Sequence, residues 1–195
     1  MIIAVVGSGG KTTLLHRLAQ QYRSEGKSVF VTTTTHMFIE EDTLLTDDAQ
    51  LIIQALKEKG YAMAGIPVGN KIRALSPETY DKVCAHADVV LVEADGSKHM
   101  PLKFPNETEP VIPHNAEEIY VVCGLHAIGR QAKEVCHRLE LVKHCLGIED
   151  DTIITQDHVR KLVSEGYLRP LSEKYPTVKI TVMPQNGSAS QTAPL

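Results

Sequence analysis

The sequence predicts an α/β protein in which helices cover both faces of a mostly parallel sheet, giving three layers. Apolar, β-branched runs alternate with amphipathic segments along the chain, as is typical of such sheets. The first run breaks into glycines and continues as Lys11-Thr12-Thr13 into a segment with helical periodicity. A strand, a glycine turn, a lysine, a hydroxyl and a helix follow one another in this order in a P-loop. The predicted fold class is therefore a P-loop NTPase-like α/β fold.

The first elements form a βαβ unit. Residues 2–6 are apolar enough for a buried strand, and residues 14–22 place apolar side chains at helical spacing before the chain turns at Gly26. Residues 28–32 then read as a second strand. Because the connections are short and pass through a helix, the two strands are expected to be parallel.

The middle of the chain continues the alternation. A helix is expected to open at residues 46–48 and to stop at Gly60, followed by a short strand at residues 61–66. Ser76-Pro77-Glu78 combines a capping hydroxyl, a proline in the first turn and an acid, which favours another helix start. Residues 88–92 have the β-branched, apolar composition of a strand that is buried on both faces.

The last part of the chain completes one domain. Residues 119–123 and 178–182 are predicted strands, and Thr155 is a predicted helix N-cap between them. With 195 residues, of which 43% are hydrophobic, the chain can bury one sizeable core. We therefore expect a single domain over residues 1–183 and a flexible C-terminal tail over residues 184–195.

Composition argues against several classes of protein. The net charge of −4 and the lack of a long basic cluster give no reason to expect nucleic acid as a partner. No apolar run reaches the ~18 residues that a membrane span needs, and the N-terminal run does not resemble a signal peptide, so a cytoplasmic protein without a membrane partner is expected. The cysteines are Cys84, Cys123, Cys136 and Cys145, with no C-x-x-C pair among them, which argues against a disulfide scaffold or a zinc knuckle.

The glycine loop predicts a nucleotide-binding site. The residues assigned to it are Gly7, Ser8, Gly9, Gly10, Lys11, Thr12 and Thr13. Glycines let backbone N–H groups approach phosphate oxygens, Lys11 is placed to reach the terminal phosphates, and the Thr12 hydroxyl is placed to bind Mg²⁺. Val5 stands where the usual motif has its first glycine, so the loop is a shorter form that resembles the ATP loop of the Mur-type peptide ligases. The alternative is a glycine turn that precedes a lysine by chance.

Two acids follow the strand at residues 88–92. In parallel sheets, ligands bind at the carboxyl ends of the strands, and an acid that ends an apolar strand there is the Walker B pattern. Glu93 or Asp95 could hold Mg²⁺ or orient an attacking nucleophile, and the sequence does not separate them. Both are therefore predicted metal ligands and, with Lys11, catalytic residues. An ordinary polar turn after a core strand is the alternative.

Other side chains at the predicted carboxyl edge are candidates for contact with phosphate or substrate. Residues 32–35 are four threonines followed by His36, so Thr34, Thr35 or His36 could contact the Mg²⁺ shell or the γ-phosphate, unless the threonines only reflect β-propensity. Lys98 and Lys103 lie beyond the acidic turn and could neutralise an anionic substrate or a transferring phosphate. A solvated loop is an equally good interpretation of these two lysines.

Together, these segments resemble the YqeC family, which is described as accessory proteins of selenium-dependent molybdenum hydroxylases. The resemblance covers residues 1 to about 165 and rests on V-G-S-G-G-K-T-T at 6–13, T-T-T-T-H-M at 32–37, V-E-A-D-G-S-K at 92–98 with P-L-K at 101–103, E-P-V-I-P at 109–113, G-L-H-A-I-G at 124–129 and H-R at 137–138. It implies a P-loop protein that binds ATP or GTP with Mg²⁺. It also implies a part in maturing a selenium-containing molybdenum cofactor, with a molybdenum hydroxylase or its cofactor as the partner.

The matching positions supply the site residues that the resemblance implies. They are Lys11, Thr12, Thr35, His36, Glu93, Asp95, Lys98, Lys103, His126 and Arg138. Arg138 could stabilise the charge on a transferring phosphate, or it could be a surface or salt-bridged arginine. The C-terminal part departs from the pattern: residues 183–187 stand where an Asn-x-x-Asp-like segment would read guanine. The choice between ATP and GTP is therefore open.

Three functional hypotheses follow. The leading one is a Mg²⁺-dependent nucleotide-binding accessory protein, a P-loop NTPase or phosphotransferase, that hydrolyses or transfers a phosphoryl group during maturation of the hydroxylase or its cofactor. The second is a small-molecule kinase or ATP-dependent ligase, whose turnover requires an acceptor. The third is a non-enzymatic, nucleotide-gated chaperone, which would bind nucleotide without releasing phosphate. A role for selenium rests on the resemblance alone.

Overall fold

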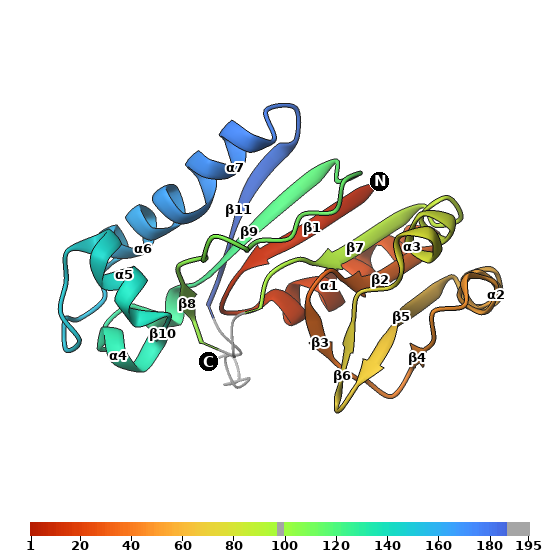
Figure 1. Ribbon diagram of the computed structural model, residues 1–195, viewed down its shortest axis with the longest axis horizontal. Helices are drawn as coiled ribbons and strands as arrows, with labels where there is room; N and C mark the ends of the chain where they lie inside the picture. Colours follow the sequence, from red (N-terminus) through yellow and green to blue (C-terminus); the bar gives the residue numbers. More distant parts are fainter. Residues whose placement is uncertain (97–99, 187–195) are drawn as a thin grey trace, which may run out of the picture.

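A computed structural model describes residues 1–96 and 100–186 of the chain (Figure 1). Nine strands of this described part form one sheet in the order β11-β9-β1-β7-β2-β5-β6-β3, with β4 beside β5, and β8 and β10 form a separate pair. The elements are β1 (Ile2–Gly7), α1 (Lys11–Ser24), β2 (Val29–Thr33), β3 (His36–Phe38), β4 (Thr43–Leu45), α2 (Ala49–Lys59), β5 (Tyr61–Val68), β6 (Lys71–Arg73), α3 (Pro77–Cys84), β7 (Val89–Glu93), β8 (Leu102–Lys103), β9 (Glu118–Gly124), η1 (Leu125–Ala127), α4 (Ala132–Val135), β10 (Cys136–His137), α5 (Leu139–Leu146), α6 (Gln156–Val163), η2 (Ser164–Leu168), α7 (Arg169–Lys174) and β11 (Lys179–Gln185).

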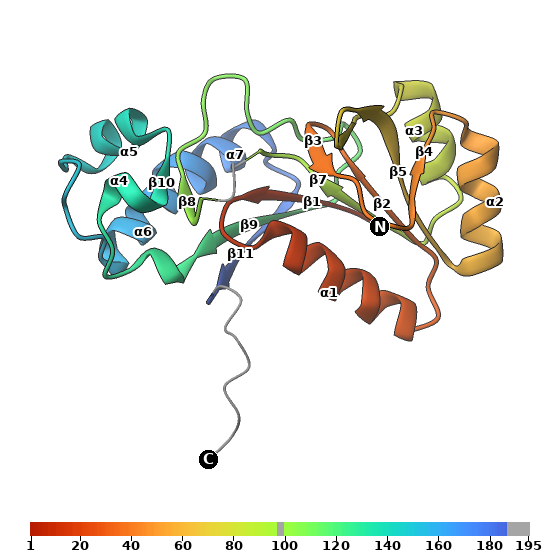
Figure 2. The ribbon, with the colours of Figure 1, turned by 90° about the horizontal axis from the view of Figure 1, so that it is seen from below.

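The sheet is mostly parallel, and helices cover both of its faces, as predicted. Successive residues of β1 point to opposite faces. Ile3 and Val5 pack with the apolar side of α1, whereas Ala4 and Val6 pack with the helices of the C-terminal region. Figure 2 shows α1 on one side of the strands and α3 and α7 on the other. The three layers therefore follow from strands that are apolar on both faces, as β1 and β7 are.

The predicted helix starts are confirmed because each depends on local chemistry. The Asp48 side chain accepts a hydrogen bond from the Gln50 N–H at 2.8 Å, and Ser76 accepts one from the Thr79 N–H at 3.4 Å. Thr155 forms a capping box with His158 at the start of α6. These bonds satisfy N–H groups that a helix leaves without partners in its first turn.

Two strands differ from their predicted limits. β5 continues past residue 66 to Val68, and its last residues pair with β6 in an antiparallel hairpin that the sequence did not indicate. β11 continues past residue 182 to Gln185 in parallel register with β9, so Pro184 and Gln185 belong to the sheet. An edge strand tolerates a proline because the missing N–H is not needed on the open side. The rest of the expected tail, residues 187–195, lies outside the described residues.

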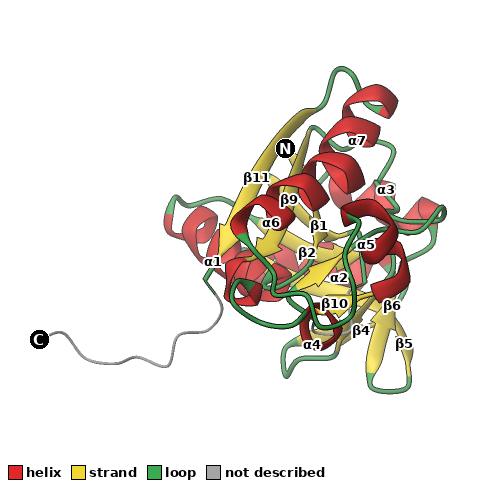
Figure 3. Ribbon diagram, turned by 90° about the vertical axis from the view of Figure 1, so that its left-hand side faces the viewer, coloured by secondary structure: helices red, strands yellow, loops and turns green. Residues whose placement is uncertain are grey.

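The C-terminal region adds a cluster of helices over one half of the sheet. Figure 3 shows α5, α6 and α7 together on one side of the strands. Between α6 and α7, residues Ser164–Leu168 form a single π-helical turn, a feature that often occurs at functional positions. This turn places the side chain of Tyr167, which is 1% exposed, inside the core beneath the sheet's carboxyl edge. Among the described residues, no helix is long and apolar enough to cross a membrane.

Candidate functional site

The glycine loop joins β1 to α1 with a backbone that excludes side chains. Gly7, Gly9 and Gly10 have φ angles of 87°, 80° and 133°, which side-chain-bearing residues rarely adopt. A Cβ atom on Gly9 would also lie 2.5 Å from the Pro101 carbonyl oxygen. No side chain in the described part of the chain caps the start of α1, so the N–H groups of its first turn remain available to an anion. The loop and the helix end together present backbone N–H groups that could hold an anion.

Lys11 lies inside the site rather than on the surface. Its side chain is 5% exposed, and its ammonium donates a hydrogen bond of 2.8 Å to the Gly7 carbonyl oxygen of its own loop. Burial lowers the pKa of Lys11, and the nearby carboxylates of Glu93 and Asp95 oppose this shift. Ser8 has a different role, because its hydroxyl donates to the Pro101 carbonyl oxygen at 3.1 Å and so anchors the loop.

The two acids after β7 are both buried but have different partners. The Asp95 carboxylate accepts hydrogen bonds from the Gly7 N–H at 3.1 Å, from the Tyr167 hydroxyl at 2.8 Å and from Lys103. Glu93 is 7% exposed, and its Oε2 atom is buried without a hydrogen-bond partner in the described structure. Burial raises the pKa of Glu93, with the charge of Lys11 opposing the shift. Asp95 is thus already used by the protein, whereas Glu93 has an acceptor oxygen to spare.

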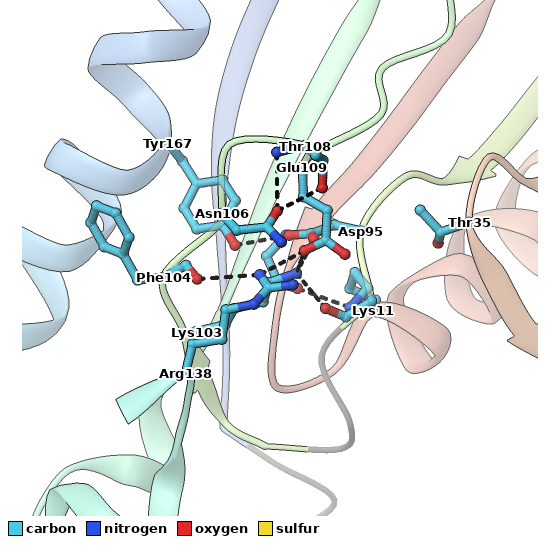
Figure 4. A network of polar contacts seen from close by, with 12 residues as sticks. Lys11, Thr35, Asp95, Lys103, Phe104, Asn106, Thr108, Glu109, Arg138 and Tyr167 are labelled. Carbon is cyan, nitrogen blue, oxygen red and sulfur yellow. Dashed lines mark hydrogen bonds and ion pairs between the residues drawn. The ribbon is translucent and has the colours of Figure 1, made fainter. Parts of the chain in front are cut away.

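A buried network of charges surrounds Asp95 (Figure 4). The Lys103 ammonium is fully buried and bonds Asp95, the Gly96 carbonyl oxygen and Glu109. Arg138 adopts a left-handed backbone conformation, with φ of 60°, and pairs with Glu109 at 2.7 Å. The network therefore joins the glycine loop, the segment after β8, and the C-terminal helices that supply Arg138 and Tyr167.

Glu109 gives this network a predictable pH dependence. Burial alone raises the pKa of Glu109, but hydrogen bonds from Arg138 and Lys103 outweigh it and lower the pKa from 4.5 to about 2. A carboxyl whose pKa is lower in the folded state stabilises the fold above its unfolded pKa and loses that contribution as pH falls toward the folded value. We therefore expect Glu109 to contribute to stability at neutral pH and to lose this contribution between about pH 4.5 and pH 2.

The measurement is urea denaturation of the native chain and of Glu109→Gln at about pH 6 and about pH 3. The stability difference between the two proteins should be large at the higher pH and should shrink at the lower one. Glu107→Gln, an exposed acid in the same segment, is the control and should show no such change. An equal difference at both pH values would contradict the lowered pKa of Glu109.

The run of four threonines is mostly structural. The hydroxyl groups of Thr32, Thr33 and Thr34 donate to backbone carbonyl oxygens of Ala64 at 2.9 Å, of Glu93 at 2.8 Å and of Val111 at 2.6 Å. These three side chains therefore tie the end of β2 to the neighbouring segments. The backbone N–H of Thr35 donates to the Thr33 hydroxyl at 2.9 Å, which fixes the turn that presents Thr35 and His36. Of the threonine candidates, Thr35 is the one that lines the site.

A cleft of about 1040 Å³ opens at the carboxyl edge of the sheet. Most predicted site residues line it: residues 9–13, Thr35, His36, Glu93, His126 and Arg138. Gly7, Ser8, Asp95 and Lys103 are not among the lining residues, because they are buried behind the loop in the contacts described above. The structure thus brings the glycine loop, one acid and the basic candidates together, and it moves Asp95 and Lys103 to a supporting position. Lys98 lies outside the described residues.

The cleft also contains residues that sequence reasoning missed. They are Phe38, Lys71, Glu109, His137 and Gln185, together with Met37 and Glu40. Phe38 and Lys71 belong to the paired strands β3 and β6, which have three residues each and leave no clear periodic signal. Glu109 lies in an irregular segment, and nothing in its spacing indicated a partner. Only the acidic residue in E-P-V-I-P could have drawn attention to that position.

The described residues give no support for a bound transition metal. They contain no group of three His, Cys, Asp or Glu residues that could hold a metal ion. Cys136 and His137 form β10, and His144 and Cys145 lie on α5. All four cysteines are free thiols. Burial raises the pKa of each, to about 11 for Cys84 and Cys136, so these thiols are poor nucleophiles at neutral pH.

Comparison with known proteins identifies relatives but no known structure. The family model described as YqeC protein matches residues 3–140 of the chain. A relative from Escherichia coli (strain K12), named "Uncharacterized protein YqeC", is 34% identical over 171 residues, which cover 83% of this chain and 67% of the relative. No solved structure matches the chain.

Proposed function

This chain belongs to the YqeC family, and from that premise and the geometry of the cleft we propose that it is a Mg²⁺-dependent ATP- or GTP-binding protein that hydrolyses the nucleotide or transfers its γ-phosphoryl group. The observation that carries the proposal is the free Oε2 atom of Glu93. A buried carboxylate oxygen without a partner is costly unless it binds a cation or a proton. This oxygen lies in the same cleft as the glycine loop and Lys11.

The residues of the cleft have different roles in the proposed phosphate chemistry. The N–H groups of the glycine loop and of the first turn of α1 would hold the phosphate oxygens. Lys11 would exchange its bond to the Gly7 carbonyl oxygen for the terminal phosphates. Thr12 and Glu93 would hold Mg²⁺, which neutralises charge on the phosphates when it is bound. Asp95 positions the loop through the Gly7 N–H and is not assigned to the metal.

Thr35, His36, His126 and Arg138 are proposed to contact the transferring phosphate or the second substrate. Arg138 is suited to a charge-stabilising role because it lies at the cleft wall and its guanidinium is already oriented by Glu109. The size of the cleft favours transfer to an acceptor as a second candidate function. Pockets for small molecules measure ~300–1000 Å³, and this one lies at the upper end of that range.

The biological context that we propose comes from the family resemblance. It is the maturation of a selenium-dependent molybdenum hydroxylase or of its cofactor, with that enzyme or cofactor as the partner. The free thiols do not favour direct selenium chemistry, because their pKa values are raised by burial. A role in the nucleotide-dependent step of maturation is therefore the form of the hypothesis that fits the site.

The proposal is tested by calorimetric titration of the chain with ATP and with GTP, each with Mg²⁺ and with EDTA, together with an assay for released phosphate. Mg²⁺-dependent binding of at least one nucleotide is expected. Absence of binding to both would refute the assignment. Tight binding with negligible phosphate release, with and without candidate acceptors, would instead favour the nucleotide-gated chaperone.

Exchanging the two acids for their amides separates their roles. In Glu93→Gln, we expect Mg²⁺ to strengthen nucleotide binding about tenfold less than in the native chain, with stability unchanged or higher, because a buried charge is removed. In Asp95→Asn, we expect a loss of about 3 kcal/mol in unfolding free energy, because Lys103 and Tyr167 lose a charged partner. Calorimetry with and without Mg²⁺ and urea denaturation measure the two effects. If Asp95→Asn alone abolished the effect of Mg²⁺ at full stability, the assignment of the metal to Glu93 would be wrong.

A further inference from the structure

The antiparallel β3–β6 pair of strands presents one basic and aromatic face. In its antiparallel register, His36 lies opposite Arg73 and Phe38 lies opposite Lys71. The central pair, Met37 and Ile72, is buried, with exposed fractions of 4% and 0%. Because side chains alternate along a strand, the other four residues share the outer face of the β3–β6 pair. A ring and three groups that can carry positive charge are therefore placed side by side.

This face belongs to the cleft that contains the glycine loop. His36, Phe38 and Lys71 line the same cavity as Lys11 and Glu93. β6 pairs with the end of β5, beyond β2, whereas His126 in η1 and Arg138 just before α5 belong to segments that follow β9. The cleft thus has two walls of different chemistry, with the glycine loop between them.

Phe38 and Lys71 form a defined pair within this wall. The Lys71 ammonium lies 4.6 Å from the centroid of the Phe38 ring, and Phe38 is 42% exposed. The partly exposed ring offers a flat apolar surface on which the ring of a ligand can stack. Glu40 also lines the cleft, and its carboxylate contacts His16 of α1 at 2.9 Å.

We propose that the outer face of the β3–β6 pair is the subsite for the second substrate, a molecule with a flat ring that stacks on Phe38 and an anionic group that meets Lys71. The inference rests on the proposed function, because this ligand is a second substrate only if the glycine loop binds a nucleotide. The volume of the cleft, about 1040 Å³, leaves room for a ligand beside the phosphates held at the loop.

The test uses a matched pair of fluorescent probes, flavin mononucleotide (FMN) as a flat-ring anion and riboflavin as its uncharged counterpart. Both are titrated into the full chain in the presence of saturating Mg²⁺ and the non-hydrolysable ATP analogue AMP-PNP. FMN is expected to bind at least about fivefold more tightly than riboflavin, as the gain from one charge interaction. Absence of saturable FMN binding, or equal affinity for the two probes, would overturn the inference.

Five single variants locate the binding. Phe38→Ala and Lys71→Ala are each expected to weaken FMN binding by about fivefold or more, and Lys71→Arg should restore most of the affinity. Asn70→Ala, in the exposed turn between β5 and β6, and Lys59→Ala, at the exposed end of α2, are the controls. Neither control should change the affinity. Unchanged affinity in Phe38→Ala and Lys71→Ala would place FMN elsewhere and refute the subsite.

The same titrations distinguish failure of this inference from failure of the proposed function. If AMP-PNP displaces FMN, the probe occupies the glycine loop. The subsite on the β3–β6 pair is then refuted, while nucleotide binding stands. If AMP-PNP does not bind but FMN does, and Phe38→Ala weakens FMN binding, the nucleotide assignment fails. The β3–β6 pair then remains a binding site for ring-bearing anions. Lys11→Ala should remove AMP-PNP binding and leave FMN binding intact.

Discussion

Replacing Lys11 with alanine is expected to weaken Mg²⁺-nucleotide binding by about two orders of magnitude. The ammonium would make charge-assisted hydrogen bonds to the terminal phosphates, and such bonds contribute ~1.5–3 kcal/mol each. Because Lys11 is 5% exposed, these bonds would form in a site with little water to screen them. The side chain already points into the cleft and needs only to leave the Gly7 carbonyl oxygen.

The measurement is calorimetric titration of Lys11→Ala with the better of ATP and GTP, combined with thermal denaturation. The denaturation temperature should not fall, since the pKa of Lys11 is lowered by burial and its charge is already disfavoured in the folded state. Lys27→Ala, an exposed lysine just beyond α1, is the matched control and should bind as the native chain does. Native affinity in Lys11→Ala would mean that the glycine loop does not hold the phosphates.

Replacing Lys103 with methionine is expected to lower the unfolding free energy by about 3–5 kcal/mol. Methionine keeps the length and apolar stem of the side chain but removes the ammonium. Asp95 and Glu109 would then remain in the core without their shared cation. A buried carboxylate that loses its partner keeps its cost of desolvation, which is why breaking one side of a buried ion pair is so damaging.

Urea denaturation measures this loss, and a double variant tests its cause. Adding Asp95→Asn to Lys103→Met removes one of the uncompensated charges, so the double variant should be more stable than the sum of the two single losses predicts. Lys143→Met is the matched control, because Lys143 pairs with acids at the surface, including Asp150 at 2.7 Å. Exposed pairs contribute little, so this loss should be much smaller. Equal losses in Lys103→Met and Lys143→Met would contradict the structural role of the buried network.

Local signals in the sequence predicted the elements whose formation is local. The capping residues Asp48, Ser76 and Thr155 each bond an N–H group within three residues, so they mark helix starts without reference to the rest of the fold. The glycine loop was also predicted, because positive φ angles at Gly7, Gly9 and Gly10 depend on residue type more than on distant neighbours. Buried strands such as β1 are apolar along their whole length and are therefore easily predicted as well.

Elements that depend on distant partners were predicted poorly. β3 has three residues and forms because β6, which follows only after β4, α2 and β5, offers it an edge to pair with. The end of β11, including Pro184, is ordered by its register with β9 and not by its own composition. In both cases the deciding hydrogen bonds join segments that are far apart in the chain, so local propensity carries little information about them.

The sequence alone determined that this protein has a parallel α/β core and a glycine loop with a lysine at the carboxyl edge of its first strand. Only the tertiary structure decided what the nearby charges do. It gave Asp95 three donors from Gly7, Tyr167 and Lys103, and it left Glu93 with a free oxygen in the cleft. The physical reason is that a carboxylate's role depends on which donors and cations surround it. Here those partners come from segments up to 88 residues away, as for Gly7 and Asp95.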